Sequence, residues 1–475
     1  MTVELTGASL TLDQVLSVAR DGDEVVIAPD ALTHMDERRA VVERVVAEGT
    51  PAYGVTTGVG MRREAGVSAG DARAFNRAAI AGHLVGLGPA VDEQVVRAAL
   101  LRLANGLVAG FQGARPAVAE ALVGQLNAGA TPSVRALGTV GQADLAQNAD
   151  LAVGVLEEVA LEAGEALALL GGNAFSTAQA ALAVADASSL LNWLDLAAAL
   201  DFEAFRANVG ALHLEIATAR PYPGIAQTLT RMHALLDGSG LWDEGAARFL
   251  QDPLTYRCVP QLHGAARDAL AFVEEQLAIE LNAHQGNPLV VASEERLVSV
   301  GNFDSQPLAA ALDFLRIAFA PVLTAAVERT LKLLSPRFSG LGEGLVAGEG
   351  WLDGLSELGV AAQAVAAEAR LLAQPVSFEL ASTMQESGVE DRTALTSLGA
   401  RRLAEMLDLG ARLLAVELTV AAQAADLRGV ERLGTGAAAA RAWTRARIAF
   451  LEGPEQMPLP LEETARDIRR QGAPA

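Results

Sequence analysis

The chain has 475 residues, of which 51% are hydrophobic but only 4% aromatic, and its formal net charge is −22 at pH 7. A core of this size must be built mainly from Ala, Leu and Val, whose modest size lets long helices approach one another closely. The negative charge repels nucleic-acid phosphates and anionic lipids, so we expect neither nucleic acid nor a membrane as a partner.

The sequence also gives expectations about the compartment and metal content. It starts without the basic and apolar segments of a signal peptide, and no run of 18 apolar residues lacks a charge. The single cysteine, Cys258, cannot form an internal disulfide. The histidines other than His83 show no metal-ligand spacing with a carboxylate. We therefore expect a cytoplasmic protein without a bound metal ion.

The first 50 residues are predicted to form a small α/β segment. Residues 4–6 and 24–28 have the composition of strands, and Thr11 with Gln14 makes a capping box for a helix that ends before Asp21. Nothing in this segment suggests chemistry.

Long helices are predicted for most of the remaining chain. Helical periodicity over 91–125 is interrupted at 110–116. Further helices are predicted over about 142–170, 176–215, 303–335, 357–374 and 395–425. No Pro/Ser-rich linker divides the chain, so we predict one continuous, mainly α body. Its expected parts are an α/β segment (1–50), a loop-rich active-site region with the first core helices (51–220), a central helical bundle (221–450) and a C-terminal tail (451–475).

The stretch from Pro132 to Leu156 is predicted to be a loop that enters a helix. Gly138 and Gly141 interrupt the loop, and a helical apolar face starts after Gln142. Free backbone N–H groups at such a positive helix end can bind an anion or hold a reactive group. An ordinary loop that caps a core helix would have the same spacing.

This loop resembles that of the aromatic amino acid lyases and aminomutases, the family of histidine, phenylalanine and tyrosine ammonia-lyases. The family sequence is Gly-Ser-Val-Gly-Ala-Ser-Gly-Asp-Leu-Ala, and its Ala-Ser-Gly cyclises into the electrophile methylidene-imidazolone. From Gly138, this chain has Gly-Thr-Val-Gly-Gln-Ala-Asp-Leu-Ala, so Gln142 and Ala143 take the place of three residues between Gly141 and Asp144. The resemblance implies a member without the electrophile, and we expect no cofactor.

Further motifs extend the resemblance over nearly the whole chain beyond residue 50. The loop that starts at Tyr53 is similar to the family's Tyr-Gly-Val-x-Thr-Gly-x-Gly, whose tyrosine is the catalytic base, and residues 251–261 nearly match Gln-Asp-Pro-Tyr-Ser-Leu-Arg-Cys-x-Pro-Gln. The resemblance implies that Tyr53 is the base, Arg257 the carboxylate clamp and Glu390 a proton relay. It implies a substrate pocket formed by His83, Gln251, Leu254, Asn302, Phe303, Gly171 and Arg392.

Departures from the family pattern concentrate around the missing electrophile. Gly171 replaces an asparagine, Leu254 a tyrosine, and Asp304 a histidine. Val389 and Arg392 replace the glutamine and histidine of a Gln-Glu-Asp-His motif. Arg392 could make a second anion contact or only a surface ion pair.

Two classes of function fit this pattern. The first is a repurposed lyase-type enzyme that catalyses elimination, addition or isomerisation of a small aromatic or unsaturated carboxylate, much as fumarase-type helical lyases use acid and base groups alone. The second is a non-catalytic ligand-binding or scaffold pseudoenzyme, and a residual amino acid ammonia-lyase is a further alternative. We favour the enzyme because Tyr53 and Arg257 remain.

The expected architecture is a long-helix bundle of the ammonia-lyase/fumarase-like type. The predicted helices 176–215 and 303–335 are apolar around much of their circumference, so other subunits are expected to cover them. Since members of the resembled family form tetramers, we expect a homotetramer. The sequence does not identify the substrate.

Overall fold

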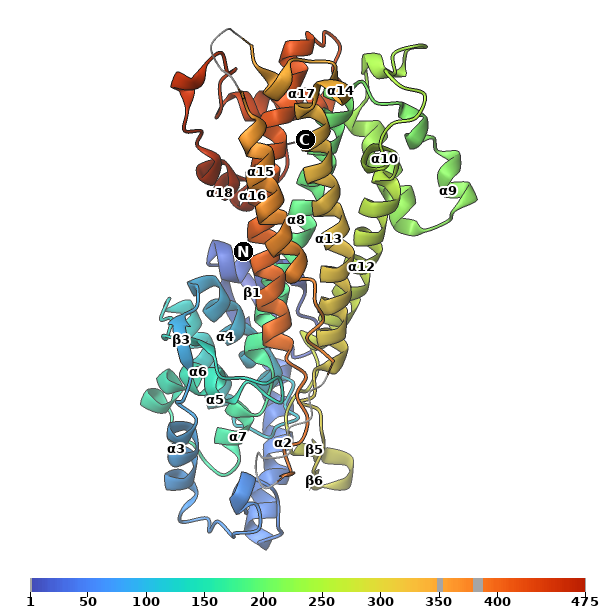
Figure 1. The fold of residues 1–475 in the computed structure, drawn as a ribbon. Coiled ribbons are helices and arrows are strands. Elements are labelled where there is room, and N and C mark those ends of the chain that lie inside the picture. Colours follow the sequence, from blue (N-terminus) through green and yellow to red (C-terminus); the bar gives the residue numbers. More distant parts are fainter. Residues whose placement is uncertain (1, 348–352, 379–387, 475) are drawn as a thin grey trace. The chain divides into compact units, whose positions relative to one another are not determined.

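The computed structural model describes residues 2–347, 353–378 and 388–474 and is mainly helical, as predicted (Figure 1). The chain forms two compact units, each assembled from three separate stretches. Unit 1 comprises Met1–Ala183, Val273–Leu312 and Pro375–Arg401, and unit 2 comprises Val184–Phe272, Asp313–Gln374 and Arg402–Ala475. These units do not coincide with the continuous ranges proposed from the sequence.

The N-terminal α/β segment of unit 1 forms as predicted. Strands β1 (Thr2–Leu5) and β2 (Glu24–Ile27) pair in parallel. Helix α1 (Leu12–Leu16) starts with the expected capping box and continues as a π-helical turn, Ser17–Asp21. The long helix α2 (Pro29–Glu48) follows.

The remaining elements of unit 1 surround its loops. The predicted break near 110–116 separates α4 from α5. Two short antiparallel pairs, β3 with β4 and β5 with β6, complete the unit. The bounds are α3 (Ala72–Gly82), α4 (Glu93–Val108), α5 (Pro116–Asn127), β3 (Leu87–Ala90), β4 (Arg135–Leu137), β5 (Leu289–Val291) and β6 (Arg296–Val298).

The prediction of a single helix over 142–170 is wrong, because this segment forms two helices. Helix α6 (Leu145–Glu158) ends where Val159 is extended, and α7 (Glu165–Leu170) begins after Gly164, whose φ is +84°. Helix α8 (Ala174–Phe205) also ends earlier than the predicted residue 215. Its last residue is followed by Arg206 with φ +59°, which helical backbone does not permit.

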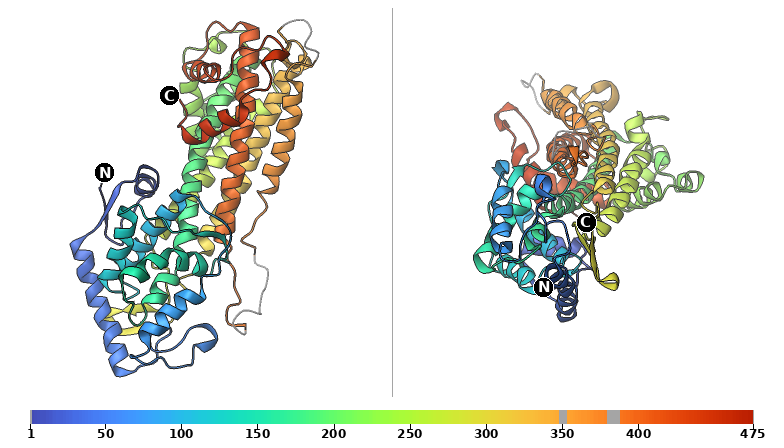
Figure 2. Two further views of the ribbon diagram at one scale, coloured as in Figure 1. Left: turned by 90° about the vertical axis from the view of Figure 1, so that its left-hand side faces the viewer. Right: turned by 90° about the horizontal axis from the view of Figure 1, so that it is seen from below.

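Helices of unit 2 lie side by side as a bundle (Figures 1 and 2). The long helices α8, α12, α13 and α16 supply residues to it, with α15 and several short helices beside them. The bounds are α9 (Glu215–Ala219), α10 (Pro223–Leu235), α11 (Leu254–Arg257), α12 (Val259–Glu280), α13 (Gln306–Leu334), α14 (Pro336–Ser339), α15 (Ser356–Leu371), α16 (Thr396–Arg428), α17 (Thr435–Arg445) and α18 (Leu461–Arg470).

A buried ionic cluster lies inside the bundle of unit 2. The Arg329 guanidinium donates to Asp201 (Nε to Oδ2, 2.7 Å) and to Glu417 (Nη2 to Oε1, 2.7 Å), and none of the three side chains is more than 1% exposed. Burial and the Glu417 carboxylate raise the pKa of Asp201 well above its ordinary value. Arg329 is therefore a core residue and not a surface ion-pair partner.

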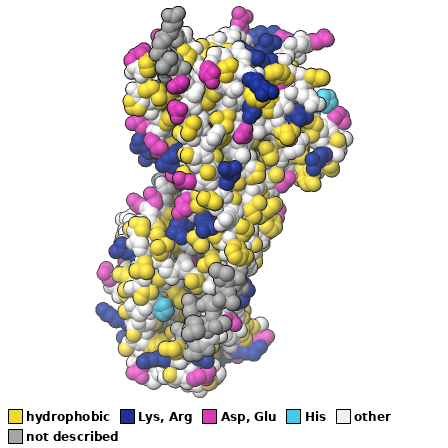
Figure 3. Space-filling view, viewed as in Figure 1, with side chains coloured by type: hydrophobic (Ala, Val, Ile, Leu, Met, Phe, Trp, Pro, Cys, Tyr) yellow, Lys and Arg dark blue, Asp and Glu magenta, His cyan; other side chains and the backbone are white. Residues whose placement is uncertain are grey.

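Two apolar stretches, Glu165–Phe205 and Gln306–Leu334, are long enough to cross a membrane, but 89% and 67% of their most apolar windows are buried inside the protein. The expectation that α8 needs another subunit to cover it is therefore wrong, because its own chain buries it. Helix α13 differs, since Phe314 and Ile317 are each 47% exposed. Exposed hydrophobic side chains lie among charged ones on the face shown in Figure 3.

Candidate active site

A cavity of about 700 Å³ lies in unit 1, where loops and helix ends converge. Its wall is formed by the loop after α2, by α3, by the loop before α6, by α7 and by segments near residues 300 and 390. The lining residues include Tyr53, Arg63, His83, Gln142, Gly171 and Glu390. The sequence-predicted Phe303 also lines this cavity, which therefore collects residues from several of the resembled motifs.

Tyr53 is held by the tight turn that carries it. The Gly60 N–H donates to its phenolic oxygen at 3.1 Å, and Ala52 C=O accepts the backbone N–H of Thr57 at 3.1 Å. Gly54, at φ +67°, passes so close to α7 that an added Cβ would lie 2.3 Å from Leu167 Cδ2. A backbone donor stabilises negative charge on the phenolic oxygen, which suits a base.

His83 follows the last turn of α3, and its orientation defines its tautomer. Its Nδ1 lies 2.7 Å from the carbonyl oxygen of Ala79. Because a carbonyl can only accept, Nδ1 carries the proton, and Nε2 of the neutral ring keeps its lone pair. The ring lines the cavity and can thus offer an acceptor to a ligand.

The loop in the electrophile position is fixed through its backbone. The Leu395 N–H donates to Val140 C=O at 2.9 Å, and a Cβ added to Gly141 would lie 2.6 Å from Leu395 N. Ala143 has φ +62°, a left-handed conformation that costs about 1–2 kcal/mol for a residue with a Cβ. Gln142 lines the cavity, and among the described residues its buried Nε2 has no hydrogen-bond partner.

Asp144 lies behind this loop and does not line the cavity. Its buried carboxylate accepts from Ser176 N–H at 2.7 Å, Ser176 Oγ at 2.9 Å and the Thr139 hydroxyl at 2.9 Å. Ser176 belongs to the first turn of α8, so the carboxylate caps that helix. Burial raises the pKa of Asp144 to about 6, against the lowering effect of these donors. Asp144 is therefore a structural anchor.

This shift predicts how stability depends on pH. Between pH 6 and 3.8 the folded state takes up a proton on Asp144 before the unfolded state does, so acidification removes a penalty of about 3 kcal/mol. His284, whose pKa burial lowers to about 4, acts in the opposite direction in both wild type and variant. Urea unfolding at pH 7, 6, 5 and 4 should show wild type gaining about 2 kcal/mol relative to Asp144→Asn, because part of the penalty remains at pH 4. A constant difference would contradict the shift.

Arg392 makes an ion pair. Its Nε lies 2.9 Å from Asp304 Oδ2, with 46% and 25% of the two side chains exposed, and it does not line the cavity. Asp304 also accepts from Gln306 N–H at 3.0 Å at the start of α13, and its backbone bridges to Gln142. The two positions at which the family resemblance implies histidine thus pair with each other.

Four other predicted site residues do not line the unit 1 cavity. Asn302 is exposed and does not line the cavity. Gln251, Leu254 and Arg257 belong to unit 2, where Arg257 Nε donates to Asp252 C=O at 2.9 Å. The cation that lines the cavity of unit 1 is Arg63, which the motif comparison missed because the Tyr53 motif ends three residues earlier.

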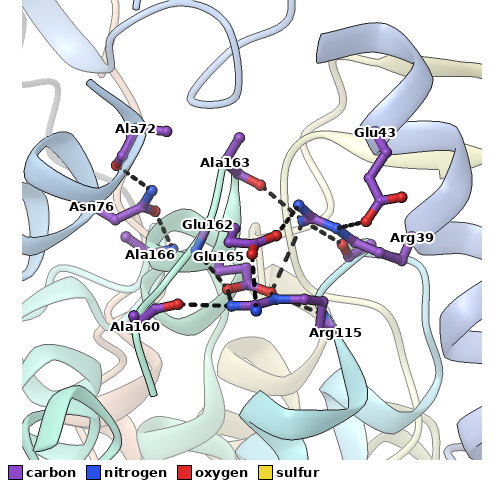
Figure 4. A network of polar contacts seen from close by, with 11 residues as sticks. Arg39, Glu43, Ala72, Asn76, Arg115, Ala160, Glu162, Ala163, Glu165 and Ala166 are labelled. Atoms are coloured by element: carbon purple, nitrogen blue, oxygen red, sulfur yellow. Dashed lines mark hydrogen bonds and ion pairs between the residues drawn. The ribbon is translucent and has the colours of Figure 1, made fainter. Parts of the chain in front are cut away.

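The wall formed by α7 rests on a polar network (Figure 4). Glu165, with no exposed side-chain surface, accepts from Arg115 Nε at 2.8 Å and Nη2 at 2.7 Å. Arg39 donates to the Ala163 carbonyl nearby, and Asn76 of α3 accepts the Ala166 N–H at 2.7 Å. The network therefore fixes the helix that presents Gly171 and its neighbours to the cavity.

Unit 2 contains a separate cavity of about 620 Å³, lined by Ser188, Ser189, Asn192 and Arg231 among others. None of the predicted site residues lines it. Within 2–347, 353–378 and 388–474, no group of three or more His, Cys, Asp or Glu side chains could hold a metal ion.

Comparisons with known proteins agree with the motifs. The sequence profile of the family described as aromatic amino acid lyase matches residues 10–156 and 150–447. Histidine ammonia-lyases from Alkaliphilus metalliredigens and Symbiobacterium thermophilum are 32% and 35% identical to this chain. Each alignment covers 95% of the chain and 93% of the relative.

Solved structures show the same fold. Tyrosine aminomutase from Streptomyces globisporus aligns with a TM-score of 0.91 at 28% identity, covering 99% of this chain and 97% of that protein. Ergothionase from Treponema denticola aligns with a TM-score of 0.92 at 24% identity, covering 99% and 98%.

Proposed function

Because the chain belongs to the aromatic amino acid lyase family, we propose that its unit 1 cavity catalyses a lyase-type reaction without methylidene-imidazolone. The reaction is elimination, addition or isomerisation on a small aromatic or unsaturated carboxylate, with Tyr53 as the general base. The observation that carries this proposal is that Tyr53, held by Gly60, lines the same cavity as Gln142 and Ala143, which replace the electrophile's residues.

The residues of the loop do not fit the prosthetic group. Cyclisation of the family's Ala-Ser-Gly needs a central residue that loses water to give the exocyclic methylidene and a glycine that supplies the attacking nitrogen. Gln142 and Ala143 offer neither. The substrate must therefore acidify its own proton, for instance through conjugation with a carbonyl group or a double bond.

This proposal predicts an unmodified chain. The intact mass should equal that of the sequence, and peptides covering 138–146 should show no loss of water. A histidine ammonia-lyase with the Ala-Ser-Gly loop, processed in parallel, provides the positive control. A deficit of two waters within 138–146 would show that the chain cyclises after all.

The other residues have roles that follow from their chemistry. His83 Nε2 and Glu390 would accept or return protons within the cavity, and Leu145, Leu167 and Phe303 supply an apolar wall for an aromatic or unsaturated body. Arg257 of unit 2 does not line this cavity. From the family resemblance alone we propose it as the carboxylate clamp, because a guanidinium binds a carboxylate through two hydrogen bonds. On the same ground, Gln251 and Asn302 are proposed to orient the ligand.

A panel of aromatic and unsaturated carboxylates, together with histidine, phenylalanine and tyrosine, tests the proposal. Turnover of a carboxylate without ammonia release supports it. Deamination of histidine would instead support the activity for which the relatives are named. Binding without turnover would support a ligand-binding or scaffold protein.

We further propose a cytoplasmic homotetramer. Phe314 and Ile317 on α13 and Phe272 on α12 are 43–47% exposed, and the rings of Phe272 and Phe314 form an edge-to-face pair with centroids 6.1 Å apart. Exposed aromatic pairs on long helices are typical of subunit interfaces.

A further inference from the structure

We propose that Arg63 activates Tyr53 by placing a positive charge beside its phenolic oxygen, so that this tyrosine ionises at a lower pH than an ordinary one. The inference rests on the proposed function for the role of Tyr53 as base, but the ionisation itself can be measured without any substrate. A free tyrosine ionises near pH 10, which is too high for an efficient base at neutral pH.

The geometry joins the two side chains through a single residue. The Gly60 N–H donates to the Tyr53 hydroxyl at 3.1 Å, while the Gly60 carbonyl accepts from Arg63 Nη1 at 3.4 Å. Arg63 follows the 3₁₀ turn Gly60–Arg62, and its own N–H closes that turn on the Gly60 carbonyl. Tyr53 and Arg63 both line the cavity, so the guanidinium and the phenol share one wall.

The charge of Arg63 is not cancelled by its neighbour. Among the described residues, Arg63 pairs with Glu64, whose carboxylate lies 3.9 Å from Nε and is 92% exposed, so water screens that pair. The Arg63 side chain is 39% exposed, which leaves its charge partly screened as well. An opposite charge near an ionisable group commonly shifts its ionisation by one to three pH units, and partial exposure favours an effect of about one.

Two other titratable groups face the cavity. His83, which follows α3, donates through Nδ1 to the Ala79 carbonyl, and Glu390 would oppose a second negative charge. Among the described lining residues, Arg63 is the only lysine or arginine. The Gly60 N–H and the Arg63 guanidinium are therefore two groups on this wall that favour the phenolate.

The small number of tyrosines makes the test direct. The chain has three: Tyr53, the 53% exposed Tyr222, and Tyr256, which is fully buried and whose pKa burial raises well above 10. In a Tyr222→Phe background, the first phenolate absorbance to appear on raising pH belongs to Tyr53, and adding Tyr53→Phe must remove it. Circular dichroism at each pH reports whether the fold is retained.

In this background, Arg63→Met should raise the pH midpoint of the Tyr53 phenolate by about one unit, and Arg63→Lys should restore most of that shift. Arg62→Met is the matched control, because Arg62 is exposed, adjacent in sequence and absent from the cavity wall. An unchanged midpoint in Arg63→Met, or an equal rise in Arg62→Met, overturns the proposal.

The outcome is separable from that of the proposed function. If Arg63→Met moves the midpoint but Tyr53→Phe leaves turnover unchanged, Arg63 activates Tyr53 and the general-base role is wrong. Once a substrate is known, Arg63→Met should also move the acidic limb of the pH–rate profile, on which the rate rises as the base loses its proton, in the same direction as the absorbance midpoint. A limb that stays fixed while the midpoint moves would assign the limb to another group.

Discussion

A Tyr53→Phe variant is expected to turn over substrate about 10²- to 10⁴-fold more slowly than wild type, while its affinity for that substrate changes little. The substitution removes the oxygen that accepts the Gly60 N–H and that would take the proton, but it keeps the ring that lines the cavity. Single-turnover kinetics with a reactive carboxylate, combined with equilibrium binding, separate the two quantities.

Two further variants should be compared with Tyr53→Phe. Tyr222→Phe removes an exposed phenol outside the cavity wall and should leave both quantities unchanged. Arg257→Met should weaken binding by a few kcal/mol if the guanidinium holds the carboxylate, because the substrate charge would lose its partner. Full turnover by Tyr53→Phe would mean that another group removes the proton.

Glu165→Ala is expected to lower the free energy of unfolding by about 3–5 kcal/mol, the usual cost of removing one partner of a buried ion pair. The Glu165 carboxylate accepts from the Arg115 side chain and from the backbone N–H groups of Arg115 and Glu162, at 2.7–3.0 Å. Figure 4 shows these contacts next to α7. In the variant the donors would lose their acceptor. Urea unfolding measures the effect.

Glu43→Ala is the matched control for this substitution. Glu43 also binds an arginine of the network, Arg39, at 3.2 Å, but its side chain is 58% exposed. An exposed pair of this kind contributes at most about 1 kcal/mol. Equal losses in the two variants would mean that burial does not determine the strength of the network. Glu165→Ala should also weaken ligand binding, because α7 forms part of the cavity wall.

The helix boundaries show where sequence patterns stop being informative. The apolar spacing of α6 continues through Val159, Leu161 and Ala163, so the pattern alone predicts one helix up to residue 170. The structure breaks the helix at the extended Val159 and at Gly164, and Glu165, which follows the break, binds Arg115, 50 positions earlier in the chain. Local periodicity contains no information about such a partner, whereas the long helices α13, α15 and α16 lie close to their predicted ranges because their apolar repeats are uninterrupted.

The candidate site likewise contains some residues that the sequence predicts and others that it does not. Motifs predicted that Tyr53, His83, Gly171 and Glu390 would be pocket residues, and all four line the cavity, because each belongs to a short loop whose local sequence defines it. The Arg392–Asp304 pair joins positions 88 apart, and neither residue suggests the other in a single sequence. Arg63 was missed for a related reason, since nothing in the Tyr53 motif indicates that the chain turns back toward it.

The way in which the two units share their helices limits how the chain can be shortened. The chain passes between units at five points, and those after residues 183, 272, 312 and 401 lie inside α8, α12, α13 and α16. A fragment cut at such a point would leave up to four backbone N–H and four C=O groups without partners and would expose apolar side chains. Neither unit can therefore be produced from one continuous gene fragment, and split-protein or domain-exchange designs should place their junctions in the loops between helices.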